Sequence, residues 1–231
     1  MNKSLYICGD SFCCLDPEYA KNWPELLLSK VNNINVVNLA SPAASNYLIY
    51  LQVKHALDQK CDYIIYNATS SIRHEFILNK NMDSTDNMLR YWDLSNPDNN
   101  KSMISMSWLN PQNTASQVLN KKIIKQHAEY FTNYIDLPSM IEKNFIFINY
   151  TLELLNKSNV IWAWNRGGFE HKNFKSTQHY NFSNWHEKES KINMWDYYDS
   201  SVIRPYYHVT NKQILQDVCN EYINMLNLDN A

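Results

Sequence analysis

Short apolar runs alternate with segments of helical spacing along the first part of the chain. The run Leu5-Tyr6-Ile7-Cys8 has the length of a buried strand, and later apolar runs are separated by segments whose apolar residues recur every three or four positions. Strands are predicted over residues 4–8, 34–39 and 62–67, and helices over residues 23–31 and about 47–59. Strands that alternate with helices favour an α/β fold with a mainly parallel sheet.

The rest of the chain continues this alternation but interrupts it twice. Periodicity fails around residues 79–113, which predicts an irregular insertion, and again in an aromatic-rich loop region around residues 165–207. Helices are predicted over about 114–134, 139–156 and 211–226, with a fourth strand over 159–164. Because there is no internal repeat and no linker, we expect residues 1–231 to form a single domain.

Composition and charge narrow the class of partner. Apolar residues make up 45% of the chain and charged residues 19%, as in ordinary globular proteins. A net charge of -2 gives no general attraction to nucleic acid or to an anionic membrane, and no apolar run approaches the roughly 18 residues of a membrane span. The N-terminus does not have the pattern of a secretory signal, so we expect a cytoplasmic or virion-associated location. The oligomeric state stays open.

The cysteines and histidines do not predict a metal site. The five cysteines are odd in number and form no Cys-x-x-Cys pair, which favours a reduced compartment. Cys13 and Cys14 follow Ser11 closely enough to line a pocket around it. The histidines of the aromatic-rich region are widely spaced and match no familiar ligand pattern. We therefore predict no metal.

The motif Gly9-Asp10-Ser11 is the first candidate for chemistry. It follows the first predicted strand, so Ser11 is expected at the strand's carboxyl end, where open α/β sheets bind ligands. Glycine, aspartate and serine are also common in ordinary turns, and the motif alone leaves both interpretations open. The chain has only three glycines, so one directly before Asp10 indicates a backbone geometry that other residues tolerate poorly.

Three predicted turns meet at one edge of the parallel sheet. The first carries Ser11, the second Ala43, and the third residues 67–71. A serine hydroxyl becomes a good nucleophile only beside a base, and the oxyanion that it forms needs hydrogen-bond donors. His208, just before the last helix, is the candidate base. The candidate donors are the backbone N–H groups of Ser11 and Ala43, together with a side chain after the third strand.

The order of these pieces resembles that of the SGNH hydrolase superfamily, also called the GDSL esterases and lipases. The similar blocks are Cys8-Gly9-Asp10-Ser11-Phe12, residues 37–46, residues 62–69 and Tyr207-His208-Val209-Thr210. The resemblance spans most of the chain. It implies a three-layer flavodoxin-like α/β sandwich, hydrolysis of esters such as acetylated sugars or acyl lipids, and no metal or organic cofactor. It also implies that Ser11 is the nucleophile and His208 the base.

The chain departs from the family pattern in all three later blocks. Ala43 stands where the second block has a glycine. In the third block Asn67 occupies the glycine position and Thr69 the position of the oxyanion asparagine, so both are candidate donors. Pro205 replaces the aspartate that lies three residues before the histidine and orients the imidazole. The candidate carboxylates for that task are then Asp199 and Asp196.

Three further residues are candidates for substrate binding: Asp10, Asn46 and Arg73. Asp10 and Arg73 each also have a simpler structural interpretation. Asp10 also fits a turn cap, and Arg73 fits a salt-bridged helix start after the third strand.

These observations lead to two hypotheses from different classes. The first is a serine esterase that deacylates a carbohydrate or another small acyl ester. The alternative is a catalytically degenerate SGNH-fold protein that serves as a binding or structural component, for example of a phage, and Pro205 is the motive for it. A nucleotide-binding flavodoxin-like domain is disfavoured because the chain has no glycine-rich phosphate loop.

Overall fold

Four parallel strands form the centre of the protein, in the order β2-β1-β3-β6. Their bounds are β1 Lys3–Cys8, β2 Ile34–Asn38, β3 Tyr63–Asn67 and β6 Ile161–Asn165. The computed structural model describes residues 3–15, 22–41, 44–71, 73–79, 101–107, 129–130, 133–134, 136–168, 182–197 and 209–230. The four strands that the apolar runs predicted are confirmed, and their ends differ from the predicted ones by one or two residues.

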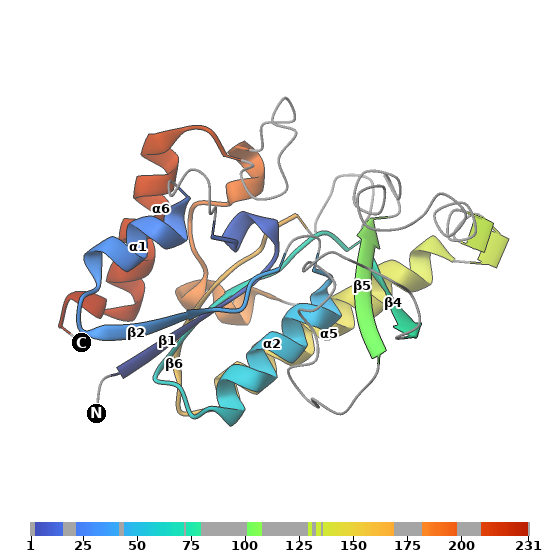
Figure 1. Ribbon diagram of the computed structural model, residues 1–231, viewed down its shortest axis with the longest axis horizontal. Helices are drawn as coiled ribbons and strands as arrows, with labels where there is room; N and C mark the ends of the chain where they lie inside the picture. Colours follow the sequence, from blue (N-terminus) through green and yellow to red (C-terminus); the bar gives the residue numbers. More distant parts are fainter. Residues whose placement is uncertain are drawn as a thin grey trace.

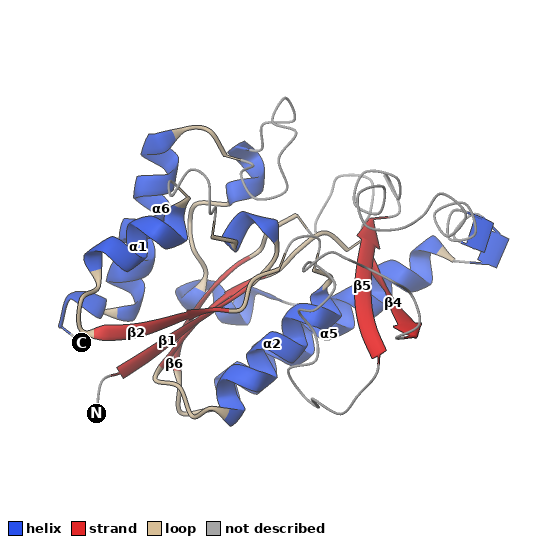
Figure 2. Ribbon diagram, viewed as in Figure 1, coloured by secondary structure: helices blue, strands red, loops and turns tan. Residues whose placement is uncertain are grey.

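Helices cover both faces of the sheet (Figures 1 and 2). Helices α1, Trp23–Lys30, and α6, Lys212–Leu226, lie on one face, and α2, Asn46–Asp58, and α5, Leu137–Lys157, lie on the other. Strand side chains alternate between the two layers, so Ile65 packs with α1 and α6 whereas Tyr66 packs with α2 and α5. The predicted three-layer α/β sandwich with a mainly parallel sheet is confirmed.

Helices α1, α2, α5 and α6 each begin at a side chain that accepts hydrogen bonds from the first turn. Asn22 caps α1, Ser45 caps α2, Asp136 caps α5 and Asn211 caps α6. Pro138 stands in the first turn of α5, where its missing N–H costs nothing, so this helix begins slightly before the predicted start at residue 139. Of the helix predicted over 114–134, residues 129–130 and 133–134 are described, and they are helical.

The region after β3 differs from the prediction. Arg73 begins a strand, β4 Arg73–Asn79, and not a helix, and β4 pairs in antiparallel fashion with β5, Lys101–Ser107. Figure 1 shows these two strands beside α5, away from the four-stranded sheet. Residues 101–107 lie within the segment that we predicted to be irregular. They pair with β4, but their sequence Lys-Ser-Met-Ile-Ser-Met-Ser does not alternate strictly between apolar and polar residues, so it does not show the pattern by which strands are predicted.

The aromatic-rich region contains two short 3-10 helices, η3 Phe182–Lys188 and η4 Met194–Tyr197. Two others are η1, Ser11–Cys13, after the first strand, and η5, Leu228–Asn230, near the C-terminus. All five cysteines are free and buried. None of the helices in the described ranges is long and apolar enough to cross a membrane.

Candidate functional site

The strand order reverses between β1 and β3. From β1 the chain passes through α1 to β2 on one side, and then through α2 to β3 on the other side of β1. Such a reversal leaves a crevice outside the carboxyl ends of the two strands, and open α/β sheets bind ligands there. Ser11 lies at this point as the first residue of η1, drawn in dark blue in Figure 1, and is 4% exposed.

Gly9 connects β1 to this turn and packs tightly against its neighbours. A Cβ atom on Gly9 would lie 2.7 Å from Cys13 Sγ and 3.2 Å from Asn67 Cβ. The positive φ among the three glycines belongs to Gly167, at 59°. Close packing, and not a left-handed backbone angle, therefore explains why other residues would be tolerated poorly before Asp10.

The side chain of Gln52 extends the sheet by one residue at Gly9. Its Oε1 accepts a hydrogen bond from Gly9 N at 2.7 Å, and its Nε2 donates to Gly9 O at 3.2 Å. Gln52 lies on α2 and is fully buried. One amide therefore satisfies both backbone groups of Gly9, as a neighbouring strand does in a sheet ladder.

Asp10 is both a turn cap and half of a buried ion pair. Its Oδ1 accepts a hydrogen bond from Phe12 N at 3.1 Å, which caps η1. Its Oδ2 accepts one from Thr69 Oγ1 at 2.6 Å and lies 3.0 Å from Nη1 of Arg73. The side chains of Asp10 and Arg73 are 1% and 11% exposed. The pair neutralises both charges and joins the turn after β1 to the segment after β3.

Two asparagines clamp the segment that follows β3. Asn46 accepts from Thr69 N at 2.9 Å and donates to Thr69 O at 3.0 Å. Asn144 donates to Ser71 O and to Arg73 O, both at 3.0 Å, and accepts from the amide of Asn46 at 3.1 Å. Both asparagines are almost fully buried. The backbone that carries Thr69 and Arg73 is thus fixed by side chains from α2 and α5.

Asn144 was not among the residues that the sequence predicted. It lies on α5 within the stripe of buried residues that includes Ile141, Phe145 and Ile148. A lone amide in an apolar stripe is a recognisable signal, because a buried polar group needs partners. The sequence alone does not identify those partners.

Asn67 lies next to Gly9 in the neighbouring strand. The β1–β3 register pairs Cys8 with Tyr66, so Asn67, the next residue of β3, lies beside Gly9. Its Oδ1 accepts a hydrogen bond from the hydroxyl of Tyr222 at 3.0 Å. Its Nδ2 is buried and has no hydrogen-bond partner among the residues that the structure describes.

The thiols closest in sequence to Ser11 are poorly suited to act as nucleophiles. Cys13 and Cys14 are both buried. Burial raises the pKa of each thiol well above its usual value, and the Asp10 carboxylate raises it further. A thiol that stays protonated at neutral pH is inert, so the two cysteines line the turn without offering a thiolate.

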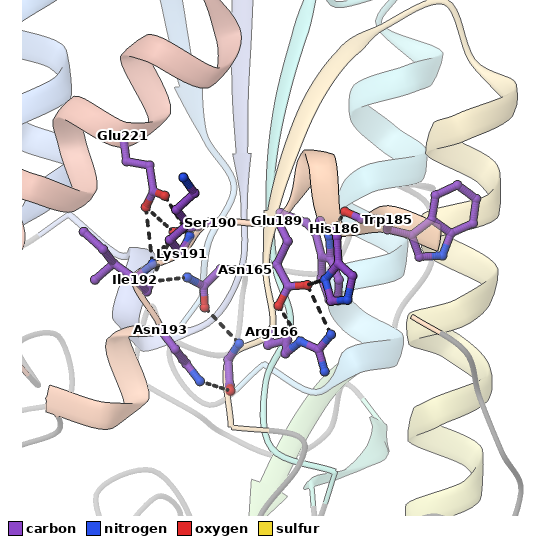
Figure 3. A network of polar contacts seen from close by, with 12 residues as sticks. Asn165, Arg166, Trp185, His186, Glu189, Ser190, Lys191, Ile192, Asn193 and Glu221 are labelled. Atoms are coloured by element: carbon purple, nitrogen blue, oxygen red, sulfur yellow. Dashed lines mark hydrogen bonds and ion pairs between the residues drawn. The ribbon is translucent and has the colours of Figure 1, made fainter. Parts of the chain in front are cut away.

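A second polar network lies beyond the end of β6 (Figure 3). Asn165 donates to Ile192 O at 2.6 Å and accepts from Gly167 N at 2.9 Å. Glu221 on α6 accepts from Ser190 Oγ at 2.6 Å and from Lys191 N at 2.7 Å. These contacts attach residues 189–193 to the edge of the sheet, and we call this network the β6 tether.

An ion-pair cluster continues the β6 tether. The guanidinium of Arg166 contacts both carboxylate oxygens of Glu189. His186 Nδ1 lies 3.1 Å from Glu189 Oε2, and this histidine is largely exposed (Figure 3). In the same region Ser190 N donates to Trp164 O at 2.7 Å, which pairs the segment with β6.

Several predicted site residues lie outside the described residues: Ala43, Asp199 and His208. Val209, the residue after His208, is 3% exposed and belongs to the core that includes α1 and α6. Asp196 lies in η4 and is exposed. The structure therefore brings together Asp10, Ser11, Asn67, Thr69 and Arg73 at one edge, with Asn46 behind them.

No group of three or more histidine, cysteine, aspartate or glutamate side chains within the described ranges is arranged to hold a metal ion. The groups that converge at the switch point are instead hydroxyls, amides and one ion pair. Such groups donate and accept hydrogen bonds, which suits recognition of a carbonyl or hydroxyl.

No protein-family model and no curated protein sequence matches the chain. Among solved structures, the chain is similar to the esterase EstA from Pseudoalteromonas sp., with 9% sequence identity, a TM-score of 0.47 and coverage of 97% of both chains. It is also similar to a protein from Desulfitobacterium hafniense DCB-2 described as lipolytic and of the G-D-S-L family, with 11% identity, a TM-score of 0.46 and coverage of 97% of this chain and 100% of that one.

Proposed function

We propose that the chain is a serine-dependent ester hydrolase of the deacylase or acetyl esterase type, which acts on a carbohydrate or another small acyl ester. One observation carries the proposal. Ser11 lies at the switch point between β1 and β3, at the start of a capped turn, where buried polar groups from both strand ends meet. A few precisely placed hydrogen-bonding groups at a switch point suit recognition of a polar ligand, because such groups fix the ligand's orientation.

In the proposed reaction Ser11 Oγ attacks the acyl carbonyl carbon while His208 takes up the hydroxyl proton. The carbonyl oxygen becomes an oxyanion, which accepts hydrogen bonds from the backbone N–H groups of Ser11 and Ala43. The tetrahedral adduct then expels the alcohol, which receives the proton from His208. Water, deprotonated by the same histidine, attacks the acyl-serine. The bond to Ser11 Oγ then breaks, Oγ takes the proton back from His208, and the carboxylic acid is released. A carboxylate from Asp199 or Asp196 is the proposed orienter of the imidazole.

Asp10, Asn46 and Arg73 support the site in this proposal. Arg73 is neutralised by Asp10 at 3.0 Å, so it favours a neutral substrate over an anionic one. Asn46 has its amide engaged with Thr69 and Asn144, and it acts on the substrate by fixing the segment after β3. A neutral acyl ester of a sugar fits this balance of charge.

Turnover and labelling of the purified chain test the proposal. The chain and its Ser11→Ala variant are assayed with short acyl p-nitrophenyl esters and acetylated sugars, and with a fluorophosphonate probe followed by peptide mapping. We expect turnover and a label on residue 11 in the chain and neither in Ser11→Ala. Ser29→Ala, an exposed change on α1, is the matched control and keeps full activity. Equal rates in the chain and Ser11→Ala, or a label elsewhere, would overturn the proposal.

The second candidate is a non-catalytic binding or structural protein with the same fold. The hydroxyl of Thr69, at the position of the family's oxyanion asparagine, donates its hydrogen to Asp10. A fixed hydroxyl at that place favours a role in stability over one in catalysis. In this case the chain binds glycans or a partner without turnover, and the fluorophosphonate probe leaves Ser11 unlabelled.

A further inference from the structure

Gln52 carries a buried amide, and both ends of this amide bind the same backbone position. The residue lies on α2 in a stripe that includes Leu48, Ile49 and Val53, and it is fully buried. Its Oε1 accepts a hydrogen bond from Gly9 N at 2.7 Å, and its Nε2 donates to Gly9 O at 3.2 Å. Burial of an amide is costly unless its polar atoms are hydrogen-bonded, so an apolar side chain would be cheaper to bury in this stripe. The amide of Gln52 is therefore matched to Gly9.

Gly9 lies where the segment after β2 begins to leave β1. Leu39 N donates to Ile7 O at 2.8 Å, which continues the β1–β2 ladder by one residue, and Ser41 N still donates to Gly9 O at 3.2 Å. The N–H of Gly9 donates instead to the side chain of Gln52. Gln52 thus takes the place of a strand carbonyl at the point where β1 ends and the serine turn begins.

The other side of the serine turn is fixed by Asp10. One carboxylate oxygen of Asp10 caps η1, and the other is bound by Thr69 and Arg73. Gly9 links the strand to this fixed turn, and glycine is the residue whose backbone rotates most freely. Hydrogen bonds at both the N–H and the carbonyl of Gly9 restrict that rotation. They therefore fix the direction in which the hydroxyl and the backbone N–H of Ser11 point.

We propose that Gln52 is a positioning residue for Ser11, because its amide fixes the backbone of Gly9 and, through it, the orientation of the nucleophile. The inference rests on the proposed esterase function. Gln52 acts through Gly9 and is not itself a catalytic residue. A misplaced nucleophile attacks more slowly while the substrate still binds, so the effect of Gln52 falls on kcat and not on KM.

Gln52→Met tests this role, because methionine fills a similar volume and removes both hydrogen bonds to Gly9. We expect kcat per folded molecule to fall about 10-fold to 10²-fold with KM nearly unchanged. Labelling of Ser11 by the fluorophosphonate probe should slow by a similar factor, because the probe reports attack by the serine hydroxyl itself. Circular dichroism measures the folded fraction.

Gln52→Glu is the conservative variant, and it restores both hydrogen bonds in one protonation state only. A protonated carboxyl has an acceptor oxygen for Gly9 N and an O–H donor for Gly9 O, whereas a carboxylate has no donor. Burial raises the pKa of a carboxyl, so the protonated form accumulates as the pH falls. We expect the ratio of kcat in Gln52→Glu to kcat in the unchanged chain to rise as the pH is lowered. The ionisable groups of the turn, Cys8 and Asp10 with its partner Arg73, are the same in both chains, so the ratio cancels their titration.

The matched control is Thr151→Val. Thr151 lies on α5, on the same side of the sheet as Gln52, is fully buried and donates to Phe147 O at 2.6 Å. The change removes a buried hydrogen bond within α5 and leaves the contacts of Gly9 intact. We therefore expect a loss of stability while kcat per folded molecule is retained.

The outcomes separate this inference from the proposed function. If the chain turns over esters and Ser11 is labelled, but Gln52→Met keeps kcat or changes KM alone, the inference is overturned and the esterase proposal stands. An equal loss of kcat in Thr151→Val also overturns it, as does a ratio for Gln52→Glu that does not rise as the pH falls. If Gln52→Met does not fold, the Gln52→Glu ratio decides alone. If the chain neither turns over esters nor labels at Ser11, both proposals fall together.

Discussion

Two polar networks lie at the carboxyl edge of the same sheet, and they differ in how completely they are satisfied. In the β6 tether, Asn165, Glu189 and Glu221 are hydrogen-bonded through both ends of their side chains or both carboxylate oxygens, and the indole N–H of the neighbouring Trp185 is buried without a partner among the described residues. Around β1 and β3, Asp10 and Asn46 are equally engaged, but Asn67 Nδ2 and Ser71 Oγ are buried without partners in the part of the chain that the structure describes.

This difference separates a structural network from a candidate site. A network whose groups satisfy one another contributes stability and has nothing left to offer a ligand. A network that leaves donors unpaired loses stability, and proteins accept such a loss chiefly at functional sites. We therefore expect changes in the β1–β3 network to affect both stability and activity, and changes in the tether to affect stability alone.

Breaking the ion pair should have the largest effect. Arg73→Met leaves the Asp10 carboxylate buried without its counter-charge, and we expect a loss of about 3–5 kcal/mol in the free energy of unfolding. Urea denaturation followed by circular dichroism measures it. Asp10→Asn/Arg73→Met removes the stranded charge and should recover much of the loss. If the double variant is no more stable than Arg73→Met, the ion pair does not account for the effect.

The two asparagines that clamp the segment after β3, Asn46 and Asn144, should show the next largest effect. Asn144→Ala leaves Ser71 O and Arg73 O without their donor, and we expect a loss of about 1–3 kcal/mol and a lower kcat per folded molecule. Asn149→Ala on the same helix is the control, because the amide of Asn149 donates to Glu153 on the same helix and not to the segment after β3. Equal effects of the two variants in urea denaturation would contradict the clamp.

The tether should show a smaller effect, limited to stability. Glu221→Gln keeps one acceptor oxygen but replaces the other with an NH2 group. One of the two donors, the hydroxyl of Ser190 or the N–H of Lys191, then faces a second donor. We expect a loss of about 1 kcal/mol. Ester turnover per folded molecule should equal that of the unchanged chain. A large drop in turnover here would remove the distinction between tether and site.

The smallest effect on stability is expected at a helix cap outside both networks. Hydrogen bonds from the hydroxyl and the backbone N–H of Ser139 lower the pKa of Asp136 below its usual 3.8. The charged cap therefore stabilises the fold above pH 3.8, and this contribution is lost as the pH falls through the lowered pKa. We expect Asp136→Asn to melt slightly below the unchanged chain at pH 7, and the difference in Tm to close in acid. A constant difference across this range would contradict the cap's charge as its source.

The central sheet could be predicted because its information is local. The apolar runs of β1, β3 and β6 and the helical spacing of α2 and α6 are each readable within a few residues, and their alternation fixes the fold class. The short strand β5 was not predicted, because its residues do not alternate regularly between apolar and polar and only its pairing with β4 identifies it as a strand.

The candidate site could be predicted in place but not in detail. The position of Ser11 followed from a motif at a strand end. The partners of Asn67 and Asp10 did not, because Tyr222 is 155 residues from Asn67 and the Asp10 contacts with Thr69 and Arg73 need the docked segment after β3. Local patterns predict where polar groups gather, and only tertiary packing decides which donors remain free.

The amide of Gln52 also affects how the serine turn moves. Gly9 N–H follows a central strand, yet its hydrogen bond goes to a side chain of α2 at 2.7 Å. Its exchange with solvent deuterium should therefore report local undocking of α2, while the neighbouring amides of β1 report opening of the sheet. Faster exchange at Gly9 than in the β1 amides would mean that the backbone beside Ser11 loosens while the sheet beneath it stays closed.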